Sequence, residues 1–123
     1  MANLIGPIQG VLNISNVQGN HLEVPLQFKS GNTPIDLSQF VQIKMEIKKT
    51  YNVNEAPFLI FTLGDGLDVS GDDNDVLSFV LGGDFWDTQD ARWVYDITFE
   101  NAEGEKYTYI KGTITNVLTA SKI

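Results

Sequence analysis

The stretch 41-VQIKMEIKK-49 alternates apolar and polar side chains without a break, and this pattern decides the fold class. A period of two residues is that of a β-strand with one face buried and the other in water. The segment therefore predicts a half-buried strand. Its inward side chains are expected to be Val41, Ile43, Met45 and Ile47, and its outward ones Gln42, Lys44, Glu46 and Lys48.

The same period recurs along the chain. It appears in 22-LEVPLQF-28, in 76-VLSFVL-81 and in 92-RWVYDITFE-100, where Trp93, Tyr95, Ile97 and Phe99 share one face. Pro25 has no amide proton to donate, so its strand is expected at a sheet edge or a bulge. Turn-forming residues separate the segments, and 101-NAEG-104 is typical of a hairpin turn before 105-EKYTYIKGTITNV-117.

These signals predict an all-β protein, an antiparallel immunoglobulin-like β-sandwich of about 7–9 short strands with one short helical turn. The turn is expected in 82-GGDFWDTQDA-91, capped by Asp84 and running through Thr88. The predicted organisation is an N-terminal arm over residues 1–18 and the sandwich domain over residues 19–123. The arm is expected to hold one short strand around Val11 to Ile14.

Composition sets the limits on function. The chain has 123 residues, a formal net charge of −8 and no cysteine. One domain is expected at this length. An acidic surface disfavours nucleic acid and acidic membranes, and the absence of cysteine excludes disulfides and thiolate metal sites. No apolar run is long enough for membrane insertion, and 1-MANLIGPIQG-10 lacks the features of a secretory signal.

The residues that catalysis needs are sparse. His21 is the only histidine and stands at the start of an expected strand, and neither GxSxG nor HExxH occurs. The sixteen carboxylates could supply a glycosidase pair, but in so acidic a chain such pairs arise by chance. We therefore expect no enzymatic activity, no catalytic residues and no cofactor.

The acidic stretch 64-GDGLDVSGDDNDV-76 resembles a cation-binding loop at first sight. The spacing of Asp68, Asp72, Asp73 and Asp75 does not follow the EF-hand pattern, and no glutamate closes the loop. Glycine, asparagine and aspartate all suit tight turns. The sequence therefore predicts a hairpin turn over Gly71–Asp75 rather than a metal site, with cation binding left open.

Aromatic residues offer a second route to function, because sugar-binding sandwiches present exposed aromatic faces. Trp86 in the helical turn and Tyr107 and Tyr109 on one face of the last hairpin are the candidates for a glycan platform. Packing in an aromatic core is the competing explanation for each of them.

Four segments between Gly19 and Val117 together resemble a known family. They are 34-PIDLSQF-40, 63-LGDGLDV-69, 93-WVYDITFENAEG-104 and 109-YIKGTITN-116, the last with an embedded glycine. Their order and spacing resemble the small immunoglobulin-like domains of phage tail and baseplate proteins, including the N-terminal domain of the baseplate upper protein family. Gln39, Ala91 and Asp75 depart from positions where glycine is frequent in that family.

The resemblance implies a structural protein of the virion, synthesised in the host cytoplasm, that docks onto other virion proteins in a symmetric multi-copy assembly of the tail, adaptor or baseplate. The arm supplies the candidate partner-binding residues, Leu4, Ile5 and Ile8, and residues 1 to about 12 are expected to reach a neighbouring subunit. Packing under the sheet is the alternative for the arm. The alternative functions are a carbohydrate-binding module for a host-surface glycan and a cation-dependent adhesion domain.

Overall fold

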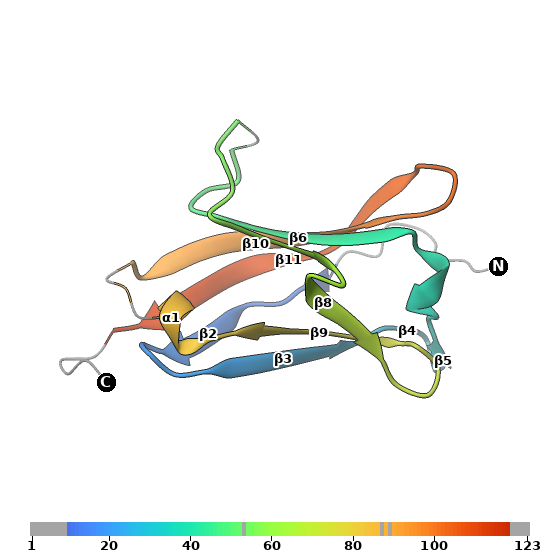
Figure 1. Ribbon diagram of the computed structural model, residues 1–123, viewed down its shortest axis with the longest axis horizontal. Coiled ribbons are helices and arrows are strands. Elements are labelled where there is room, and N and C mark those ends of the chain that lie inside the picture. The colour runs from blue at the N-terminus through green and yellow to red at the C-terminus, as the bar shows by residue number, and fades with distance from the viewer. Residues whose placement is uncertain (1–9, 53, 87, 89, 119–123) are drawn as a thin grey trace.

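The computed structural model describes residues 10–52, 54–86, 88 and 90–118, and these residues form an all-β protein (Figure 1). The strands are β1 (Gly10–Val11), β2 (Ile14–Val17), β3 (Leu22–Gln27), β4 (Lys29–Ser30), β5 (Thr33–Pro34), β6 (Gln42–Lys48), β7 (Leu59–Leu63), β8 (Gly66–Ser70), β9 (Val76–Leu81), β10 (Arg92–Glu100) and β11 (Lys106–Val117). Two helical turns accompany them, η1 (Leu37–Gln39) and α1 (Gly83–Trp86). None of the described helices is long and apolar enough to cross a bilayer.

Nine of these strands form one sheet that folds over on itself and nearly closes. Its order is β1-β11-β10-β6-β7-β8-β9-β3, and β2 also pairs with β11. Figure 1 shows β11, β10 and β6 in one layer and β9 and β3 in the other. β8 pairs with β7 on one side and with β9 on the other, so it carries the sheet from the first layer to the second. The short β4 and β5 pair with each other.

The strand directions are mixed, so the prediction of a purely antiparallel sheet is wrong. β1 and β2 run parallel to β11, and β7 runs parallel to β8. The short connection from β7 to β8 includes Gly64, with a φ of 84°, and β8 begins at Gly66, with a φ of 104°. Turn signals in the sequence report hairpins between consecutive strands, whereas β2 and β11 are far apart in the sequence and meet only in the folded chain.

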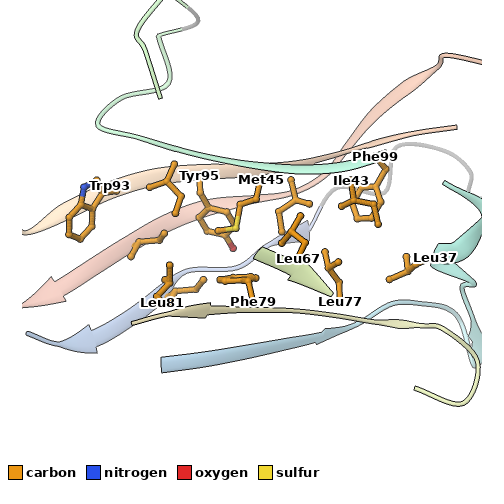
Figure 2. Packing of buried hydrophobic residues seen from close by; sticks show 14 of the residues in the cluster. Leu37, Ile43, Met45, Leu67, Leu77, Phe79, Leu81, Trp93, Tyr95 and Phe99 are labelled. Carbon is orange, nitrogen blue, oxygen red and sulfur yellow. The ribbon is translucent and has the colours of Figure 1, made fainter. Parts of the chain in front are cut away.

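The core lies between the two layers, where the alternating segments place their apolar faces (Figure 2). Ile43, Met45 and Ile47 of β6 are completely buried, as predicted. The predicted inward face of β10 is confirmed as well, because Trp93, Tyr95, Ile97 and Phe99 are at most 1% exposed. Val41 is the exception: it precedes the first residue of β6 and is 59% exposed.

The second layer ends at β3, whose only partner among the described strands is β9. Pro25 therefore lies on an edge strand, as its missing amide proton predicts. Leu22, Val24 and Leu26 are half-buried and pack against the core. His21 is exposed and comes one residue before β3.

The N-terminal segment differs from the prediction. In place of one strand around Val11 to Ile14, β1 and β2 are separate, and Leu12 and Asn13 pass between them over Gly112 of β11. The Leu12 amide donates to the carbonyl oxygen of Lys111, and the Tyr95 hydroxyl donates to the Leu12 carbonyl oxygen. Residues 10–17 thus belong to the same sheet as the rest of the domain, and residues 1–9 lie outside the described residues.

The predicted helical turn exists but is shorter than expected. α1 ends at Trp86, and Asp84 lies in its first turn rather than before it. A second turn, η1, was not predicted. Asp36 caps it, with a carboxylate oxygen 2.9 Å from the amide nitrogen of Ser38, and this hydrogen bond explains the turn within 34-PIDLSQF-40.

Candidate functional site

Trp86 belongs to the core, so its prediction as an exposed glycan platform is wrong. The side chain is completely buried, and its indole nitrogen donates to the Leu81 carbonyl oxygen at 3.1 Å. Its ring packs edge-on against Phe85 and Trp93. The short helical turn α1 lies over one end of the core, and its aromatic residues Phe85 and Trp86 pack into it.

A bulge changes the expected arrangement of the last hairpin. The register moves from Ile97 opposite Ile110 to Thr98 opposite Thr108. Tyr107 is partly buried against the core, and its hydroxyl donates to Glu105 Oε1 at 3.2 Å. The side chain of Tyr109 lies outside the described part of the structure.

The candidate partner-binding residues Leu4, Ile5 and Ile8 also lie outside the described residues. In the part of the arm that the structure describes, Leu12 packs against the core, whereas Val11 is 68% exposed. Packing under the sheet, the alternative for the arm, therefore holds for Leu12.

The acidic stretch forms the predicted hairpin turn. β8 and β9 pair antiparallel, and Gly71 and Asn74 have φ values of 92° and 54°. Asp75 is 4% exposed and accepts a hydrogen bond from Gln27 Nε2, and its carbonyl oxygen accepts from the amide of Phe28. Asp75 therefore attaches the turn to β3. Within the described residues, no three His, Cys, Asp or Glu side chains are placed to hold a metal ion together.

One concave site among the described residues was not predicted. It lies on the outer face of the layer formed by β11, β10, β6 and β7, and Tyr51 of the loop between β6 and β7 lines it. Figure 1 shows this loop rising away from the layer. The hollow has a volume of about 320 Å³ and is lined by Glu46, Lys48, Tyr51, Val94, Tyr95, Asp96 and Thr98. We call it the Tyr51 hollow.

Tyr51 is held through its hydroxyl while its ring stays accessible. Its hydroxyl donates to the Gly112 carbonyl oxygen at 2.8 Å, across the sheet from the loop. Lys111 Nζ lies 5.9 Å from the ring centre, a cation–π distance. The residue is nevertheless 53% exposed. Partial burial, followed by the Asp96 carboxylate, raises the pKa of Tyr51.

Two carboxylates lie side by side in this hollow. Asp96 of β10 stands directly opposite Glu46 of β6 in the antiparallel register. Glu46 is within 3.3 Å of Lys44 Nζ and 3.9 Å of Lys48 Nζ. Burial, and then the charge of Glu46, raises the pKa of Asp96, although three nearby lysines oppose the shift.

A second hollow of about 610 Å³ continues along the same face and shares Glu46 and Thr98 with the first. Its other lining residues are Gln42, Lys44, Ile60, Thr62, Glu100 and Lys106. The alternation in β6 did predict that Glu46 and Lys48 point outward. No periodic pattern in the sequence points to Tyr51. It stands in a polar loop, and its hydroxyl bonds to Gly112, which is 61 residues away in the sequence. The only signal in the sequence was an aromatic residue in an otherwise polar loop.

The sheet edge carries an exposed apolar patch. Val17 of β2 is opposite Val117 of β11, and these two and Leu118 are 38%, 49% and 43% exposed. Val11 of β1 lies further along the same edge and is the most exposed of the large hydrophobic residues described. We call Val17, Val117 and Leu118 the edge patch; Val11, which pairs with Lys111, stands apart from it.

Comparisons with known proteins assign no family. No family model matches the chain, and no curated protein matches it. One similar solved structure comes from photo-crosslinking analyses of cell-adhesive interactions of VGSC beta subunits, with 12% identity, a TM-score of 0.43 and coverage of 98% of this chain and 99% of the other. Another is a Photobacterium sp. JT-ISH-224 2,6-sialyltransferase, with 18% identity and a TM-score of 0.39. The match covers 90% of this chain and 18% of that one.

Proposed function

We propose that the chain is a non-enzymatic structural component of a phage virion, in the tail, adaptor or baseplate, that docks onto other virion proteins in a multi-copy assembly. The observation that carries docking is the edge patch. Its three side chains are apolar on a protein of net charge −8, and they lie on β2 and at the end of β11 beside it. The virion setting rests on the sequence resemblance.

The edge patch suits a protein partner for two reasons. Contiguous exposed apolar side chains on a small soluble domain commonly mark interaction surfaces. The patch also lies on edge strands, so a neighbouring chain could pair with the backbone of β2 while covering Val17 and Val117. Such pairing uses main-chain hydrogen bonds for affinity and side chains for specificity.

We also propose that the fold is an immunoglobulin-like sandwich with a variable-type sheet. The pairs β3 with β9 and β9 with β8 match strands B, E and D, and the order β11-β10-β6-β7 matches G, F, C and C′. β2, parallel to β11, then occupies the place of an A′ strand. Phage structural domains of the family that the sequence resembles share this sandwich, which supports the proposed role.

The test measures incorporation into particles. A variant lacking residues 2–9 and a double variant, Val17→Asp with Val117→Asp, would be supplied to a phage that lacks the gene, and purified particles would be analysed by mass spectrometry. The deletion stops before Gly10 because residues 10–12 contribute β1 and the Leu12 contacts to the fold. We expect both variants to fold and to be absent from particles.

Val80→Asp is the matched control, because Val80 is a 43% exposed valine on β9 in the other layer. It should be incorporated normally. Normal incorporation of the edge-patch double variant would overturn the docking surface. A protein that never copurifies with particles, wild type included, would overturn the virion role itself.

A further inference from the structure

The Tyr51 hollow has the features of a small-ligand site, and nothing in the proposed docking role requires it. We propose that it binds a neutral sugar ring, which stacks on Tyr51 and hydrogen-bonds to Glu46, Lys48 and Asp96. The volume of about 320 Å³ lies at the small end of the range of ligand pockets. This site would add direct contact with a glycan to the structural role.

The charges in and around the hollow select the class of ligand. Glu46 and Asp96 are acceptors, and Lys48 in the hollow, together with Lys44 and Lys111 nearby, supplies donors. A net cation would meet three ammonium groups and a net anion two carboxylates, so neither sign is favoured. A neutral polyol suits both, because each hydroxyl can donate to a carboxylate and accept from a lysine. The polar lining disfavours a purely apolar ligand.

Tyr51 provides the apolar contact that such a site needs. Its ring is half-exposed, yet the hydrogen bond from its hydroxyl to the Gly112 carbonyl oxygen fixes its position before any ligand arrives. Val94, 7% exposed, adds an aliphatic contact beside it. An aromatic ring held in advance loses little conformational freedom on binding, which favours affinity.

The polar side chains are also positioned in advance. Lys44 and Lys48 both contact the Glu46 carboxylate, and the side chain of Lys48 is only 17% exposed. Asp96 lies opposite Glu46, on a strand that is distant from it in the sequence. Two like charges in this arrangement destabilise a sheet. Perturbed carboxylates held in a concavity are typical of functional sites. The adjoining hollow would accept further sugar units of an oligosaccharide.

The experiment uses the full chain. Binding would first be screened on an array of immobilised neutral oligosaccharides built from glucose, galactose, mannose and N-acetylhexosamines. Positive sugars would then be titrated in solution, with ¹H–¹⁵N NMR shifts followed at Asp96, Thr98 and Lys48. We expect at least one neutral saccharide to bind and to shift these amides.

Variants separate stacking from folding. Tyr51→Ala should weaken binding by about tenfold or more, whereas Tyr51→Phe, which keeps the ring and loses only the bond to Gly112, should bind more tightly than the alanine variant. Asp96→Asn should also weaken binding while leaving the fold at least as stable. Glu103→Gln, in the exposed β10–β11 turn, is the control and should bind as wild type.

Three outcomes would overturn the proposal. They are an array with no signal, binding confined to charged glycans, and binding unaffected by Tyr51→Ala. The result is independent of the docking role, because Tyr51 lies outside the edge patch, so Tyr51→Ala should still enter particles.

Discussion

Asp96 shows how one side chain can lower the stability of the fold in a way that the sequence does not reveal. It follows Tyr95 in a strongly alternating strand and reads as an ordinary outward residue, yet it stands opposite Glu46 and is partly buried. Since its pKa is raised in the folded chain, folding favours the protonated carboxyl. The stabilisation from this group is present below its ordinary pKa of 3.8 and is lost as the pH rises through the raised value.

The first prediction follows from the raised pKa of Asp96. Because the folded chain disfavours the charged form of Asp96, Asp96→Asn should raise the free energy of unfolding at pH 7 by up to about 1 kcal/mol. The gain should shrink as the pH falls, because the wild-type carboxyl takes up its proton more readily in the folded chain than in the unfolded chain. Urea unfolding between pH 4 and pH 7 measures the difference. Glu103→Gln removes the same charge from an exposed turn and should show no comparable gain; an equal gain there would assign the effect to net charge.

At the scale of elements, the crossing of the chain over β11 depends on Gly112. A Cβ atom at this position would overlap the backbone of Leu12 and come within 3.2 Å of Asn13 Oδ1. The contact is with backbone, so it cannot be relieved by rotating a side chain. The glycine embedded in 109-YIKGTITN-116 is therefore explained by the close approach to β11 of the segment between β1 and β2.

The second prediction is that Gly112→Ala destabilises the fold by about 1–3 kcal/mol or more. The added methyl group must push residues 12–13 away from β11, which also strains the hydrogen bond from Tyr95 to Leu12. Thermal unfolding measures the loss, and hydrogen exchange should rise at the Leu12 amide. Gly82→Ala is the control, since a Cβ there would have no atom within 4 Å. Equal effects of the two substitutions would contradict this account.

The third prediction concerns the segment between α1 and β10. The side-chain nitrogen Nδ2 of Asn116, a residue of β11, donates to the carbonyl oxygens of Trp86, Thr88 and Asp90 at 3.0, 3.3 and 3.0 Å. Asn116→Asp would place a buried carboxylate against these oxygens and should cost about 2 kcal/mol or more. Chemical denaturation tests it. Thr115→Asp, an exposed position one residue earlier, should cost far less, and a comparable loss there would contradict this role.

These elements also show what the sequence can and cannot predict. The alternation in β6 and β10 gave the buried faces correctly because burial of one sheet face is a local, periodic property. Val41 was misassigned because the periodicity continued past the true start of β6. The parallel pairs, the bulge beside Tyr109 and the reach of Tyr51 to Gly112 depend on contacts between distant segments, for which local pattern carries no signal.

For the molecule as a whole, charge is unevenly distributed. Four of the seven lysine and arginine residues in the described ranges, Lys44, Lys48, Lys106 and Lys111, lie on the outer face of the layer that holds the hollows. Exposed carboxylates gather instead around β8 and its turn, at Asp65, Asp68, Asp72 and Asp73. With a net charge of −8, the compact state brings these carboxylates close together.

The last prediction is that added salt stabilises the fold. Raising sodium chloride from 10 to 200 mM shortens the Debye length to below about 10 Å, which screens repulsion between exposed carboxylates more than it weakens the few ion pairs. The melting temperature should rise by about 2–5 °C. Calcium chloride at equal ionic strength should raise it by a similar amount, because the turn over Gly71–Asp75 is held by its backbone and by the bond from Gln27 to Asp75. A melting temperature that falls with added salt would contradict the repulsion argument. A larger rise with calcium than with sodium would show that the acidic turn binds calcium. That result would favour a cation-dependent adhesion domain.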